Sequence, residues 1–102
     1  MSSSTERIVA ALSTLIDARE AAMLHRLDTL SPQERAVFVL IGHGMRVKQV
    51  AYELAISAKT VETHLVRIRG KLAGEAMVGP DLAELTFLAR LWVRASAGSG
   101  TS

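Results

Sequence analysis

The 102-residue chain has no cysteine, only two prolines and few aromatic side chains. Without cysteine it can form no disulfide and carry out no thiolate chemistry, which fits a reducing compartment. No uninterrupted apolar stretch is long enough to cross a bilayer, so we expect no membrane partner. The amino end, Met-Ser-Ser-Ser-Thr-Glu-Arg, lacks the basic start and the apolar run of a secretory signal. We therefore expect a cytoplasmic protein.

The residues that are present indicate a folded domain with a basic middle. Hydrophobic residues make up 49% of the chain, which excludes a wholly disordered protein. Residues 44–71 contain six basic and two acidic side chains, whereas residues 1–43 and 72–102 each contain one more acid than base. A local excess of positive charge is compatible with a nucleic-acid partner, but also with a solvated helix face.

Apolar side chains at helical spacing predict one long amphipathic helix near the amino end, from about Thr5 to Leu27. They are Ile8, Leu12, Leu15, Ile16, Met23 and Leu27, with alanines between them. Ser3 and Glu6 have the spacing of a capping box, which would fix where this helix begins. We assign residues 1–29 to it and expect its apolar stripe to serve in packing or dimerisation.

The start and stop signals of a second helix follow. Ser31, Pro32 and Glu34 combine a capping box with a proline at the first helical position, which predicts a helix from Pro32 to about Ile41. Gly42-His43-Gly44 ends it, because glycine adopts the left-handed conformation at little cost.

Two more helices are predicted after a short connection. The first runs from Val47 to Leu54, and Ser57 can cap a longer one over about Ala58–Leu72. The longer helix has an apolar stripe formed by Val61, Leu65, Ile68 and Leu72. Its outer face is basic. Two such helices suit a helix-turn-helix in which the second helix enters the major groove of DNA.

A last helix is predicted after Gly79-Pro80-Asp81, and no segment alternates like a strand. We therefore predict an all-α fold. Its parts are an amino-terminal helix (residues 1–29), a helix-turn-helix core (30–74), a carboxy-terminal helix (75–95) and a flexible polar tail (96–102).

The segment LSPQERAVFVLIGHGMRVKQVAYELAISAKTVETHLVRIRGKLA, about 43 residues from Leu30 onward, resembles the DNA-binding domain of the LuxR/GerE family. The matching positions include Leu30, Ser31-Pro32-x-Glu34-Arg35, Gly44, Lys48, Val50-Ala51, Leu54, Ile56-Ser57, Lys59-Thr60-Val61, His64, Ile68 and Lys71-Leu72. The resemblance implies a LuxR-type helix-turn-helix, a transcription regulator whose partner is duplex DNA, and no cofactor.

The added amino-terminal helix has no counterpart in the minimal domain of this family. We expect it to stand in place of the receiver or ligand-binding domain that usually lies upstream. The expectation is a stand-alone regulator without a phosphoacceptor and without an autoinducer pocket.

The same resemblance assigns base contacts to the outward residues of the first recognition turns, which are Glu62, Thr63 and Val66. Family members often carry a basic residue where Glu62 and Val66 stand. Glu62 could accept a hydrogen bond from a cytosine amino group, and Val66 or the Thr63 methyl could contact a thymine methyl. Val47 is a second departure, because a capping Ser or Asn usually stands there.

Phosphate contacts are expected from side chains near the amino end and along the outer face of the recognition helix. They are Lys48, Ser57, Lys59, Thr60, Arg67, Arg69 and Lys71. These contacts would position the protein on DNA without reading sequence. A homodimer is expected as well, with an interface drawn from Leu82, Leu85, Leu88, Leu91, Trp92, Leu12 and Leu15; Phe87 is a further candidate.

Two other functions stay open. A protein-interaction module of the same fold could bind another regulator or RNA polymerase through its outer face. In that case, Glu62 and Val66 would indicate that the face has lost its function in reading DNA. A sigma-factor region-four-like module shares the two-helix geometry, although His64 fits LuxR relatives better. The three histidines are 18 and 21 residues apart without metal-site spacing, and no nucleophile elbow or glycine-rich phosphate loop is present, so we expect no metal and no enzyme.

Overall fold

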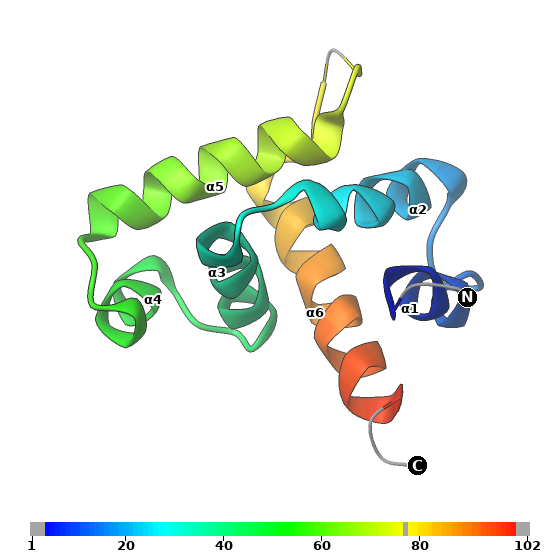
Figure 1. The fold of residues 1–102 in the computed structure, drawn as a ribbon, viewed down its shortest axis with the longest axis horizontal. Coiled ribbons are helices and arrows are strands. Elements are labelled where there is room, and N and C mark those ends of the chain that lie inside the picture. Colours follow the sequence, from blue (N-terminus) through cyan, green and yellow to red (C-terminus); the bar gives the residue numbers. More distant parts are fainter. Residues whose placement is uncertain (1–3, 77, 100–102) are drawn as a thin grey trace.

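The computed structural model describes residues 4–76 and 78–99 and consists of helices joined by short loops (Figure 1). Its elements are α1 (Ser4–Ala11), α2 (Ala18–His25), the 3₁₀ helix η1 (Arg26–Thr29), α3 (Pro32–Gly42), α4 (Val47–Leu54), α5 (Ala58–Ala73) and α6 (Leu82–Ser99). No strand occurs among the described residues, and the predicted all-α class is confirmed. None of the helices in this part of the chain is long and apolar enough to cross a membrane.

The helices α3, α4 and α5 begin and end where the sequence signals predict. Ser31 accepts a hydrogen bond from the Glu34 amide at 3.1 Å, and the Glu34 carboxylate accepts one from the Ser31 amide at 2.9 Å. After α3, Gly44 adopts a φ of +88°, which turns the chain toward α4. Ser57 caps α5 by accepting a hydrogen bond from the Thr60 amide at 3.0 Å.

The predicted apolar stripe of α5 lies in the core. Val61, Leu65, Ile68 and Leu72 are all buried, and α5 packs against both α3 and α4. Val50 and Ala51 of α4 are buried opposite this stripe. The small side chain of Ala51 lets the two helices of the motif approach closely. The core therefore fixes which face of α5 points away from the molecule.

The helix α6 lies beside α3, on the side away from α4 (Figure 1). It begins after Asp81, whose carboxylate accepts a hydrogen bond from the Glu84 amide at 2.8 Å, and it packs mainly against α3. Gly42 makes this contact possible, because a side chain there would collide with the backbone carbonyl of Ala89. The predicted boundary of the tail at residue 96 was wrong: α6 continues to Ser99, and residues 100–102 lie outside the described part.

The prediction of one continuous helix from Thr5 to Leu27 was also wrong. The chain leaves the helical conformation after Ala11 and starts again as α2 at Ala18. The reason is a capping box that the alanine-rich pattern concealed: Asp17 accepts a hydrogen bond from the Glu20 amide at 2.7 Å, and Glu20 accepts one from the Asp17 amide at 3.0 Å. The expected cap at Ser3 lies outside the described residues.

The break lets both halves of the amino-terminal segment pack onto the rest of the chain. Side chains from α1, α2 and η1 join one hydrophobic core with those of α3 to α6. Several polar contacts hold the segment in place. Arg19 forms an ion pair with Glu84 of α6 at 2.9 Å, and Arg26 donates to the carbonyl oxygen of Leu72 in α5 at 3.1 Å. The segment is therefore an integral part of the fold.

Candidate nucleic-acid interface

The turn between α4 and α5 sets the angle of the helix-turn-helix. Ala55 ends α4 in the left-handed conformation, with a φ of +55°, and the Ile56 amide donates to the Ala51 carbonyl at 3.0 Å. A positive φ is unfavourable for a residue with a Cβ, so the surrounding packing holds this turn in place. The turn directs the amino end of α5 away from the core.

Hydroxyl and amide groups gather at the amino end of α5. The Ser57 and Thr60 hydroxyls are 2.8 Å apart, and both side chains are exposed together with Lys59. The first backbone amides of a helix lack internal partners and carry the positive end of the helix dipole. This arrangement is chemically suited to a phosphate group.

The three residues assigned to base contact lie on the exposed face of α5. Glu62, Thr63 and Val66 are all exposed, and Val66 keeps 66% of its surface. The Thr63 hydroxyl donates to the Lys59 carbonyl at 3.1 Å, so it is already occupied by the helix backbone. The face therefore offers one carboxylate and apolar groups, a combination that suits cytosine amino and thymine methyl groups.

The cations assigned to phosphate contact fall into two groups. Lys48, Lys59 and Arg67 are exposed, and none of them forms an ion pair with a described residue. Arg69 donates from Nε to the Pro80 carbonyl at 2.8 Å, and Lys71 donates from Nζ to Glu34 at 2.6 Å. The last two therefore have structural contacts that their sequence positions did not reveal.

The contact with Lys71 explains how the acidic side chain of Glu34 can be buried. The Glu34 side chain is only 4% exposed and accepts hydrogen bonds from both Lys71 and the Ser31 amide. Burial alone would raise the pKa of the Glu34 carboxyl, but the hydrogen bonds and the charge of Lys71 outweigh it and lower the pKa below 4.5. Glu34 is therefore held as a carboxylate between the start of α3 and the end of α5.

Sequence reasoning missed one cation at the start of α4. The structure places the N-cap at Arg46 instead of Val47, and the Arg46 amide donates to the Gln49 side chain at 2.9 Å. The side chain of Arg46 is exposed and makes no ion pair within the described ranges. Gln49, three residues after the cap, was the signal that could have located this position.

His64 is one of the positions that carry the resemblance to the LuxR/GerE family. It is half-buried in α5, and its Nδ1 atom is buried without a hydrogen-bond partner in the described structure. We therefore assign His64 a packing role.

The residues assigned to a dimer interface also divide into two groups. Four of them are buried in the core of a single chain: Leu12, Leu85, Leu88 and Trp92. At most 4% of the surface of each of these residues is accessible, so the fold of one chain already uses them, and their place in a dimer interface stays a prediction. The remaining residues are Leu15 and Leu82, which are exposed, and Leu91, which is half-buried; Phe87 is 45% exposed.

Comparison with known proteins agrees with this geometry. Residues 28–76 match the family described as "Bacterial regulatory proteins, luxR family". The transcriptional regulatory protein FixJ of Rhizobium meliloti (strain 1021) is 35% identical over 83 residues, which are 81% of this chain and 39% of FixJ. The transcriptional regulatory protein UhpA of Escherichia coli (strain K12) is 43% identical over 47 residues, which are 46% of this chain and 24% of UhpA.

The chain thus spans less than half the length of these relatives. No solved structure matches it at a significant level. The matched range 28–76 contains α3, α4 and α5 complete, with their caps and their connecting turn. Residues 28–76 of this chain are therefore a helix-turn-helix domain of the luxR family of bacterial regulatory proteins.

Proposed function

We propose that the chain is a sequence-specific regulator of transcription that binds duplex DNA as a homodimer in the cytoplasm, with α5 in the major groove. The observation that carries the proposal is the outer face of α4 and α5. This face holds Lys48, Lys59 and Arg67, exposed and without ion-pair partners among the described residues, around the exposed amino end of the recognition helix. Cations that are free in the folded chain are available to phosphates.

Each part of the face has a separate task in this proposal. Ser57, Lys59 and Thr60 bind one phosphate at the amino end of α5, and Lys48 with Arg46 binds another beside α4. Glu62, Thr63 and Val66 face the base edges and read cytosine and thymine. Arg69 and Lys71 act first through their contacts with Pro80 and Glu34.

The homodimer uses the apolar surface that a single chain leaves exposed on α6. Phe87 and Leu91 lie four residues apart and therefore on one side of the helix, and both retain accessible surface. A dimer that binds two half-sites one turn of DNA apart needs its two α5 helices about 34 Å apart. A single-chain mass in light scattering at micromolar concentration would rule out this part of the proposal.

A second candidate function, a protein-interaction module for another regulator or RNA polymerase, is favoured by a specific observation. Tyr52 on α4 is 86% exposed, and Val66 on α5 is 66% exposed. Exposed apolar groups next to the acidic Glu62 also suit a protein partner. This function predicts that no duplex DNA is bound.

Fluorescence anisotropy with a random pool of duplex DNA, at about 50 and 200 mM salt, separates the two functions. Sequencing of the bound fraction then gives the preferred site. We expect binding that weakens steeply with salt and enriches an inverted repeat. Lys59→Ala should weaken binding, whereas Arg7→Ala, a change at an exposed cation on α1, should not. Absence of binding at the lower salt concentration would instead support the protein-interaction module.

A further inference from the structure

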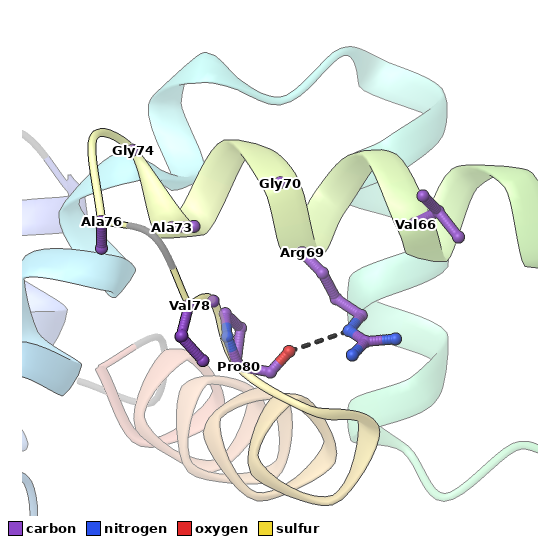
Figure 2. A pocket seen from close by; sticks show the side chains of 9 residues that line it. Val66, Arg69, Gly70, Ala73, Gly74, Ala76, Val78 and Pro80 are labelled. Atoms are coloured by element: carbon purple, nitrogen blue, oxygen red, sulfur yellow. Dashed lines mark hydrogen bonds between the residues drawn. The ribbon is translucent and has the colours of Figure 1, made fainter.

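A groove continues the exposed face of α5 toward its carboxyl end (Figure 2). Its volume is about 570 Å³, and it lies between the second half of α5 and the segment that leads to α6. One wall is formed by Val66, Arg69, Gly70 and Ala73, and the other includes Pro80. Val66 belongs both to this groove and to the proposed base-contacting face. No acidic side chain lines the groove within the described residues.

Of the three glycines that line this groove, Gly70 is the one that internal packing does not require. A Cβ added at Gly70 would meet no atom within 4 Å, and Gly70 lies inside α5, where glycine disfavours the helix. Gly79 on the opposite wall differs, because a Cβ there would lie 2.8 Å from the Arg69 carbonyl oxygen. Gly79 is therefore needed for close packing inside the chain. At Gly70 the missing side chain only leaves the groove unfilled.

A cation is fixed at the edge of the same groove. The hydrogen bond from Arg69 Nε to the Pro80 carbonyl, 2.8 Å long and drawn in Figure 2, orients the guanidinium across the groove. The two terminal nitrogens of Arg69 have no hydrogen-bond partner in the described part of the chain. A positive group beside an apolar surface fits a sugar–phosphate chain, with the phosphate at Arg69 and the deoxyribose against Val66 and Ala73.

We propose that this groove receives the sugar–phosphate backbone of the DNA whose bases face Glu62, Thr63 and Val66. The proposal rests on the proposed function and extends the interface to the second half of α5. Gly70 is the point where the DNA backbone comes closest to the helix. Arg69 supplies a phosphate contact in addition to its contact with Pro80.

The test compares Gly70→Ala and Gly70→Leu with the unchanged chain on the selected duplex. Ala11→Leu is the matched control, because Ala11 is also an exposed helical residue, on α1. Gly70→Leu fills the groove and should weaken DNA binding about tenfold, which corresponds to about 1.4 kcal/mol, because the leucine side chain would occupy the space that the sugar–phosphate chain needs. Gly70→Ala should raise the midpoint of thermal unfolding, because alanine favours the helix and meets no neighbour.

The outcomes separate this inference from the proposed function. If Gly70→Leu folds and binds DNA like the unchanged chain, the groove proposal is wrong while DNA binding stands. If the unchanged chain binds no DNA, both are wrong. If Ala11→Leu weakens binding as much as Gly70→Leu, the effect is not specific to the groove and the proposal is overturned.

Arg69→Gln provides an independent measurement. Glutamine can still donate a hydrogen bond toward Pro80, but it removes the charge. If Arg69 binds a phosphate, the slope of log affinity against log salt concentration should become shallower by about 0.9. The same change at Arg7, an exposed cation on α1, should leave the slope unaltered. A loss of affinity with an unchanged slope would show that Arg69 has only a structural role.

Discussion

Two arginines of the amino-terminal segment and three cations of the helix-turn-helix differ in their contacts. Arg19 pairs with Glu84 of α6, and Arg26 donates to the Leu72 carbonyl of α5. Lys48, Lys59 and Arg67 are exposed and have no ion-pair partners among the described residues. This fold therefore uses Arg19 and Arg26 to hold its own helices together and leaves Lys48, Lys59 and Arg67 available to an anion.

We expect the largest loss of stability from a change in the buried part of the amino-terminal segment. Leu24 in α2 is fully buried, so Leu24→Ala should lower the free energy of unfolding by about 2–5 kcal/mol. Urea denaturation followed by circular dichroism measures this value. Leu15→Ala, a change at an exposed side chain in the same segment, is the control. Equal effects of the two changes would show that the amino-terminal segment is not packed as described.

The next largest loss of stability is expected for Glu34→Gln. It should lower the free energy of unfolding by about 2 kcal/mol at neutral pH, because it removes a charge that Lys71 and Ser31 stabilise. The pKa of Glu34 is lowered on folding. Its contribution to stability is therefore complete above pH 4.5 and is lost as the pH falls through the lower pKa of the folded state. Denaturation of both proteins between neutral and acidic pH should show their difference shrinking below pH 4.5. A difference that stays constant there would contradict the pairing.

A change at the turn should stabilise the protein. Ala55 has a φ of +55°, where glycine is at no disadvantage, so Ala55→Gly should raise the free energy of unfolding by about 1 kcal/mol. The shift of the denaturation midpoint tests this expectation. Ala36→Gly, a change inside α3, should destabilise instead. A loss of stability from Ala55→Gly would mean that the turn is not left-handed in solution.

The smallest effect is expected at the ion pair between α2 and α6. The side chains of Arg19 and Glu84 are 49% and 26% exposed, so solvent screens their attraction. Arg19→Ala should therefore lower the free energy of unfolding less than any of the destabilising changes above, and the loss should shrink as salt is added. A double-mutant cycle with Glu84→Ala measures the coupling energy of the pair itself. A coupling energy as large as the effect of Leu24→Ala would mean that the ion pair is a main anchor of the amino-terminal segment.

Local signals explain what the sequence predicted well. The caps of α3 and α5 depend on residues three positions apart, Ser31 with Glu34 and Ser57 with Thr60, so they are visible in the sequence. The buried face of α5 follows from its helical period. The outward direction of Glu62, Thr63 and Val66 follows from the same period, and the structure places all three on the surface.

What the sequence did not reveal depends on distant partners or on competing local signals. The partners of Arg69 and Lys71 are 11 and 37 residues away, and no spacing rule predicts such contacts. The apolar face of α6 could be recognised in the sequence. The sequence did not show that α3 and α1 of the same chain pack on this face and bury Leu88 and Trp92. In the amino-terminal segment, the alanine-rich helical pattern masked the capping box of Asp17 and Glu20.

We infer that the free cations of the helix-turn-helix, and not those elsewhere on the surface, bind the phosphates of DNA. The most direct test is the salt dependence of anisotropy binding for Lys59→Ala and Arg67→Ala against Arg7→Ala, a change at an exposed cation on α1. We expect the first two changes each to make the slope of log affinity against log salt concentration shallower by about 0.9, and the third to leave it unchanged. Equal slopes for all three variants and the unchanged chain would contradict this role of the cations.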